Sequence, residues 1–74
     1  MIKKICCING KDEKILLIVE PWAEEYWIEP KGRVDVVGAG GVEDGFFEVE
    51  HLDMGMIVYG WEGSNLSVFV MVTW

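Results

Sequence analysis

The chain concentrates carboxylates and aromatic rings between residues 20 and 30. This stretch, Glu-Pro-Trp-Ala-Glu-Glu-Tyr-Trp-Ile-Glu-Pro, holds four of the thirteen acids and two of the four tryptophans. Adjacent carboxylates at Glu24 and Glu25, with tryptophan platforms on either side, could carry out acid–base chemistry on a sugar. That mechanism needs two carboxylates across a cleft, and a chain of 74 residues has little room for one. We therefore expect a contact surface here and no enzyme activity.

Two prolines bracket this stretch and indicate an edge element. Pro21 and Pro30 each remove a ladder donor, so both belong at strand ends or on an edge strand. In an extended chain Trp27 would share a face with carboxylates, and we expect it to be solvent-exposed. Core packing competes with a contact role for the other rings, and we favour it for Trp22 and Tyr26. The candidate contact residues are Trp22, Glu24, Glu25, Tyr26, Trp27, Glu29 and Trp61.

The single histidine has no partners that would make it catalytic or metal-binding. His51 is not accompanied by a Gly-x-Ser-x-Gly elbow or another activating motif. In a strand, Glu48 and Glu50 share one face while His51 points to the other, so the three cannot converge on a metal. We predict no metal and no cofactor.

The cysteines and the glycine-rich loop are also best explained structurally. Cys6 and Cys7 are adjacent, so in a strand they point to opposite faces and cannot form an ordinary disulfide with each other. Their scarcity favours a reducing compartment, and we expect a cytoplasmic protein. The run Gly38-Ala39-Gly40-Gly41 leads into another strand instead of a helix, which argues against a phosphate-binding loop.

The net charge of −7 is unevenly distributed. Residues 1–14 carry four lysines and two acids, net +2, whereas residues 15–74 carry two cations and eleven acids, net −9. Direct nucleic-acid binding is unfavourable for such a chain, because phosphate contacts dominate that affinity. No apolar run approaches the roughly 20 residues of a membrane span, so we expect no membrane partner. A basic protein is compatible with the charge.

Dense turn signals predict an all-β fold in a single domain over residues 1–74. Runs rich in β-branched and aromatic residues recur at short intervals between Gly, Pro, Asn and Asp clusters, which is typical of a sandwich or barrel. Alternation predicts buried Phe47 and Val49 in one strand, buried Val34 and Val36 in another, and a shared face for residues 57, 59 and 61. We expect an antiparallel sandwich or jelly-roll-like barrel of six or seven strands, within residues 2–8, 14–20, 25–28, 33–38, 46–52, 56–61 and 66–73.

Two of these strands do not alternate. Residues 15–19 and 68–72 are apolar throughout, and the second run continues to Trp74. An open sheet has one inner face, so such strands need a second cover, either from closure into a barrel or from another subunit. We therefore expect a homo-oligomer, in particular a twofold dimer.

The bracketed segment resembles a motif of small uncharacterised bacterial all-β proteins. These run E-P-W-G-E-E-Y, then a turn with proline, then a valine-rich strand, and this chain matches at Glu20–Tyr26, Ile28, Pro30 and Val34–Val37. The similarity extends over residues 19–70, with a second stretch at 58–64. The chain departs from the pattern at Ala23, where glycine is usual, and at the acidic Glu29. The resemblance implies a small β-fold and no particular activity.

Three functions remain open from the sequence. The first is a non-catalytic binding or assembly module that uses the exposed aromatic residues. The second is an acidic inhibitor or immunity-type protein that covers the basic, nucleic-acid-binding surface of a partner, which predicts strong salt dependence. The third is a small-ligand or sugar-binding barrel, which requires a concave aromatic pocket.

Overall fold

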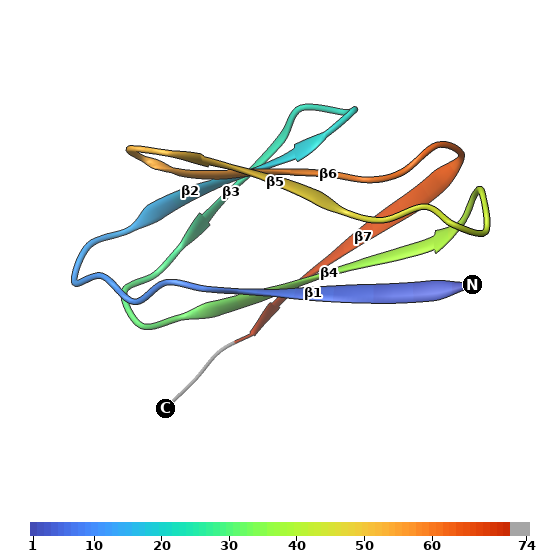
Figure 1. The fold of residues 1–74 in the computed structure, drawn as a ribbon. Helices are drawn as coiled ribbons and strands as arrows, with labels where there is room; N and C mark the ends of the chain where they lie inside the picture. The colour runs from blue at the N-terminus through green and yellow to red at the C-terminus, as the bar shows by residue number, and fades with distance from the viewer. Residues whose placement is uncertain (72–74) are drawn as a thin grey trace.

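The chain folds into two β-sheets packed face to face. The computed structural model describes residues 1–71, in which seven strands form: β1 Ile2–Ile8, β2 Ile15–Glu20, β3 Glu24–Ile28, β4 Arg33–Gly40, β5 Glu48–Leu52, β6 Gly55–Tyr59 and β7 Ser64–Met71. One sheet has the order β1-β4-β7 and the other β3-β2-β6-β5 (Figure 1). The predicted all-β sandwich is confirmed. Both sheets are open, so the alternative of a closed, jelly-roll-like barrel is wrong.

The strand boundaries follow the turn residues closely. Pro21 precedes β3 and Pro30 follows it, while glycines lie at the ends of β4 and β6. The last predicted strand, 66–73, begins two residues earlier, at Ser64, and its positions 72 and 73, like Trp74, lie outside the described residues. Local turn chemistry was therefore sufficient to locate the strands.

The connections between strands differ from a chain of hairpins. Only β2–β3 and β5–β6 are consecutive antiparallel neighbours within a sheet; the other four connections in residues 1–71 cross from one sheet to the other. The expectation of a wholly antiparallel fold is wrong, because β2 and β6 pair in parallel. A parallel pair needs a long crossover, and here the chain between them passes through β3, β4 and β5.

The core lies between the two sheets. Its fully buried side chains come from inward positions of the central strands: Leu17 and Val19 on β2, Val34 and Val36 on β4, and Val58 on β6. The predicted burial of the two β4 valines is confirmed. These residues are β-branched or leucine, which suits a layer in which side chains from two facing sheets interdigitate.

Asn9 holds the β1–β2 crossing at one end of the sandwich. Its side chain is fully buried, and its amide nitrogen lies 2.8 Å from the carbonyl oxygen of Glu13, 3.0 Å from that of Ile28 and 3.1 Å from that of Glu29. The backbone N–H of Asn9 donates to the Gly32 carbonyl at 3.0 Å. Asn9-Gly10 therefore does not make a hairpin; the asparagine ties the first crossing to the β3–β4 crossing.

Trp61 closes the other end. Its ring is 8% exposed, its Nε1–H donates to the Gly40 carbonyl at 2.8 Å, and Phe47 meets it edge-on with centroids 5.1 Å apart. A Cβ on Gly38 would lie 2.5 Å from the ring, and one on Gly45 would also overlap it. Glycines thus make room for an indole that joins the β4–β5 and β6–β7 crossings.

The predictions for the β5–β6 hairpin are wrong in the burial of Val49 and in the place of Trp61. Every residue of β5 is exposed, and Val49, expected to be buried, remains 36% exposed because β5 is an edge strand. Val58 supplies the buried face of β6, while Ile57 and Tyr59 point outward. Trp61 does not extend their face, because it lies beyond the end of β6 and turns into the interior.

Candidate binding surface

β3 presents the bracketed segment as an edge strand, as its prolines predict. Ile28 points inward and is 1% exposed, whereas Trp27 points outward and is 52% exposed. The predicted exposure of Trp27 is confirmed. Glu25 shares its outer face, since the two residues are two apart on the same strand.

The other candidate residues near β3 do not converge with Trp27. Glu24 and Tyr26 lie on the inner side, where the Tyr26 hydroxyl donates to the Glu24 carboxylate at 2.8 Å; this bond raises the pKa of Tyr26. Glu29 follows the strand, 3.8 Å from the Lys14 ammonium. Because Glu24 and Glu25 point to opposite sides, they cannot flank one glycosidic bond.

Trp22 and Trp61 exchange the roles expected of them. Trp22, for which core packing was favoured, is 50% exposed in the β2–β3 turn, while Trp61, proposed for contact, is buried. In the same turn Ala23 adopts a left-handed conformation, with φ of 55°. A glycine would adopt that conformation without strain.

The strand register places residues from four different strands side by side around Trp27, and together they form one surface. Across the outer side of the four-stranded sheet, Trp27 pairs with Leu16, Ile18 with Ile57, and Glu20 with Tyr59. On β5, Glu50 lies opposite Ile57 and Glu48 opposite Tyr59. We call this surface the acidic face; its members are Leu16, Ile18, Glu20, Glu25, Trp27, Glu48, Glu50, Leu52, Ile57 and Tyr59.

The acidic face has an apolar centre and a carboxylate rim. Leu16, Ile18 and Ile57 on the central strands are buried or half-buried, and the glutamates lie toward the edges of the face. The Tyr59 hydroxyl donates to the Glu50 carboxylate at 2.8 Å, which raises the pKa of Tyr59. An apolar centre with a polar rim is the usual anatomy of a protein–protein interface.

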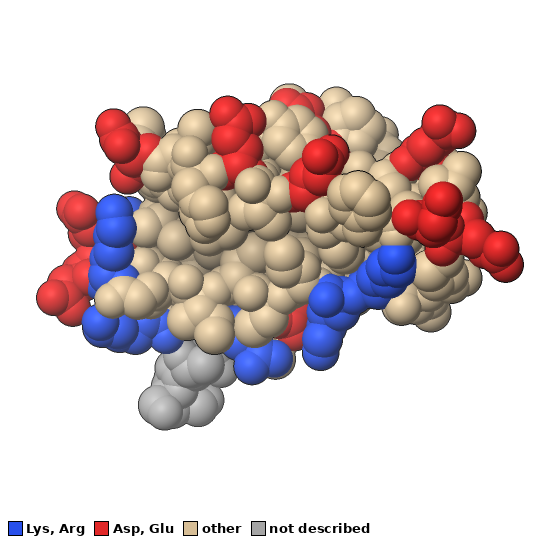
Figure 2. Space-filling model, in the orientation of Figure 1, with Lys and Arg blue, Asp and Glu red and all other residues tan. Residues whose placement is uncertain are grey.

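The two sheets differ in the charge that their strands carry. The strands of the four-stranded sheet carry five glutamates and no lysine or arginine, whereas β1, β4 and β7 carry three cations and one acid. Figure 2 shows this separation, with carboxylates predominating along the upper side and lysine and arginine lower, toward the three-stranded sheet. A partner of the acidic face therefore meets a negative potential.

The outer face of the three-stranded sheet contains one buried acid in a cationic setting. Asp35 is 7% exposed and accepts two hydrogen bonds from the Arg33 guanidinium, at 3.2 and 3.3 Å, with the Lys4 ammonium 3.9 Å away. The bonds from Arg33 lower the pKa of Asp35. On the opposite, core-facing side of the sheet, burial raises the pKa of the Cys7 thiol to about 11, so it is a weak nucleophile at neutral pH.

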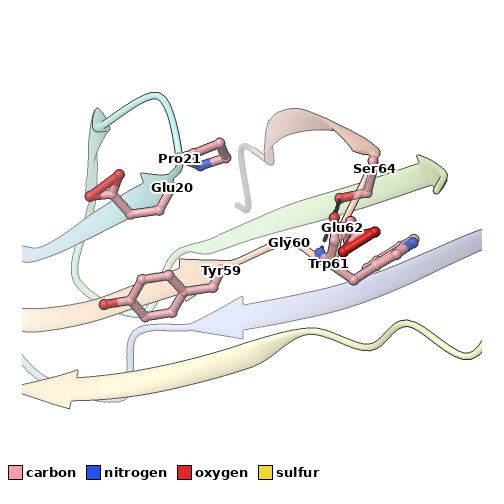
Figure 3. A pocket seen from close by; sticks show the side chains of 8 residues that line it. Glu20, Pro21, Tyr59, Gly60, Trp61, Glu62 and Ser64 are labelled. Atoms are coloured by element: carbon pink, nitrogen blue, oxygen red, sulfur yellow. Dashed lines mark hydrogen bonds between the residues drawn. The ribbon is translucent and has the colours of Figure 1, made fainter. Parts of the chain in front are cut away.

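A shallow hollow of about 300 Å³ lies beside the acidic face. It is lined by the end of β2 and the β6–β7 connection, including Glu20, Pro21 and Ser64. Tyr59 and Trp61 extend away from one another on either side of Gly60 (Figure 3). The lining of the hollow is largely apolar, but its two aromatic rings do not face one another as the paired platforms of a sugar site would.

Within residues 1–71, no three His, Cys, Asp or Glu side chains gather in a way that could hold a metal ion. No helix among these residues is long and apolar enough to cross a membrane. His51 is exposed on β5, on the side opposite Glu48 and Glu50.

The fold and the acidic face together define a small, open β-sandwich with an uncovered sheet face. Comparison with protein-family models, curated proteins and solved structures finds no match. The functional argument accordingly depends on the geometry and charge of the surface itself. From the sequence, Trp27 and Glu25 were expected in a contact surface, but the contribution of β2 and β6 to that surface was missed. The features that could have indicated it are the apolar run 15–19 and the shared face of residues 57 and 59.

Proposed function

We propose that this protein is a non-catalytic binding module, that the acidic face is its contact surface, and that its partner is a protein with a basic and partly apolar surface. The observation that carries the proposal is the row of Trp27, Leu16, Ile18, Ile57 and Tyr59 rimmed by glutamates. Tryptophan and tyrosine provide large contact areas at low entropic cost and are enriched among binding hot spots.

The partner chemistry follows from the rim. The four glutamates of the acidic face, Glu20, Glu25, Glu48 and Glu50, with no cation on the same strands, favour lysine or arginine around an apolar contact. This arrangement also supports the second function, an acidic inhibitor or immunity-type protein that covers a nucleic-acid-binding surface. The two functions differ in how much of the binding affinity the carboxylates supply. The dependence of the affinity on salt concentration measures this contribution.

The test uses a synthetic peptide of alternating lysine and leucine, titrated into isotope-labelled protein and followed by amide chemical shifts. We expect the shifts to map to β2, β3 and β6, and Trp27→Ala to weaken binding by at least about tenfold. Trp22→Ala is a matched control, because its ring is 50% exposed against 52% for Trp27 but lies in the turn. Equal effects of both variants, or shifts confined to the three-stranded sheet, would overturn the proposal.

Repeating the titration at several salt concentrations separates the two candidates. If apolar contact dominates, affinity changes by less than about threefold between 50 mM and 500 mM salt, and a loss of more than about tenfold favours the acidic inhibitor. The other part of the function expected from the sequence is assembly with further copies of itself, for which a surface without carboxylates is better suited.

A further inference from the structure

The two sheets of the described chain end in four edge strands, and one of them lacks protection. Edge strands expose unpaired N–H and C=O groups, and soluble proteins commonly protect them with charge or proline. β1 carries two lysines, β3 carries two glutamates and is bracketed by prolines, and β5 carries two glutamates. β7, with the sequence Ser-Asn-Leu-Ser-Val-Phe-Val-Met, carries no charge, proline or glycine.

The second half of β7 is exposed on both faces. Phe69 and Val70 point to opposite sides of the sheet and are 53% and 60% exposed, and Met71 is 43% exposed. Val34 lies directly across from Val70 on β4 and is fully buried. Burial is therefore lost at the last strand of the sheet, and one more strand beside β7 would bring side chains against Val70 and Phe69.

Charge selects a second copy of this chain as that neighbour. Two copies of net charge −7 repel each other, and the repulsion is smallest where they meet through a surface without carboxylates. Pairing through β3 or β5 would bring glutamates together, whereas β7 is uncharged and its sheet carries three cations and one acid on its strands. Antiparallel pairing of β7 with another β7 is also self-complementary about a twofold axis.

We propose that the free edge of β7 is a self-association site, where a second copy adds its own β7 antiparallel to make one continuous six-stranded sheet. The proposal rests on the assembly part of the proposed function and is independent of the acidic face, which lies on the other sheet. Twofold pairing occupies the free β7 edge of both copies at once. Association through this edge therefore stops at a dimer and does not continue into a filament.

The mass in solution tests this directly. Sedimentation equilibrium from about 10 µM to about 1 mM should show a transition from 8.4 kDa to twice that mass. Phe69→Lys and Val70→Lys should each remain monomeric throughout, since a charge on an edge opposes strand pairing. Both side chains are more than half exposed, so the fold should persist, and circular dichroism melting verifies it. Ile8→Lys, on the edge strand β1 and 63% exposed in the wild type, is the control and should dimerise as the wild type does.

The outcomes also distinguish this proposal from the acidic-face proposal. Concentration-dependent protection of β7 amides from hydrogen exchange, and intermolecular contacts between β7 strands in mixed-label samples, would support it. A wild type that stays monomeric at about 1 mM, a species larger than two copies, or variants that dimerise normally would overturn it. Loss of dimer in Trp27→Ala but not in Phe69→Lys would overturn it as well, and would make the acidic face the self-association surface.

Discussion

Replacing Asn9 by alanine should destabilise the protein more than any change of similar size on its surface. The side chain is fully buried, its amide donates to three backbone carbonyls on two segments, and its Oδ1 accepts the Lys11 N–H at 2.9 Å. Alanine fills none of these roles. The Ile28 carbonyl would lose a donor in the buried site that the amide now occupies, while the Glu29 carbonyl would retain the Gly32 N–H.

The magnitude follows from the number of bonds. One NH₂ group has two hydrogens, so its three contacts amount to two full bonds, and the bond to Oδ1 makes a third. At about 1 kcal/mol net per bond, the loss is about 3 kcal/mol. A domain of 74 residues has a total stability of about 4–11 kcal/mol, so the variant should lose a large share of it. The melting temperature should fall by about 12–24 °C.

Urea denaturation followed by circular dichroism, together with calorimetry, measures the loss. Asn65→Ala is the control, because Asn65 is exposed and should change stability by less than about 0.5 kcal/mol. A loss below about 1 kcal/mol for Asn9→Ala would refute the reasoning, since it would show that water or relaxation replaces the amide at no cost.

The variant Asn9→Asp tests the same hydrogen bonds through the pH dependence of stability. A carboxylate of the same shape would face the carbonyl oxygens of Ile28 and Glu29, which raises the pKa of the new acid in the folded state. The folded protein then binds more protons than the unfolded chain, so stability falls as the pH rises from about 4, the ordinary value, through the raised folded pKa. Asn9→Ala lacks this dependence. An Asn9→Asp variant as stable as the wild type at neutral pH would contradict the assigned hydrogen bonds.

Two further predictions concern a strained turn and a buried acid. Ala23→Gly should stabilise the protein by up to about 1 kcal/mol, because φ of 55° strains an L-residue. The control Ala39→Gly, within β4, should destabilise the protein by about 0.5–1 kcal/mol. Chemical denaturation of both variants measures these changes. Asp35 has a lowered pKa, so its contribution is present above about pH 4 and is lost as the pH falls through the folded value. Asp35→Asn should therefore flatten the acid limb of the stability curve, and an unchanged limb would contradict the bonds from Arg33.

The local features of the chain were predictable from its residues. Proline has no N–H wherever it occurs, so Pro21 and Pro30 could mark an edge strand without knowledge of its neighbours. The same strand geometry separated Trp27 from Ile28 correctly, since successive side chains alternate. These statements depend on a few adjacent residues.

The long-range features were not predictable. Asn9-Gly10 looks like a hairpin turn, yet β1 pairs with β4, because a fully bonded asparagine stabilises a crossing between sheets. Trp61 looked like a contact residue, yet glycines at positions 38 and 45, distant in the chain, leave space for its ring. Both outcomes depend on which segments meet, and the pattern of one segment carries no information about another.

By itself, the sequence determined the all-β class, the positions of the strands and the exposure of Trp27, because these follow from backbone preferences and a two-residue alternation. Only the tertiary structure decided the parallel β2–β6 pair, and through it the acidic face, since that register places Ile18 beside Ile57 and Glu20 beside Tyr59. Within residues 1–71 it also left β7 without a strand neighbour on one side. Strand order is set by packing between distant segments, and the candidate surfaces of this protein exist only through that order.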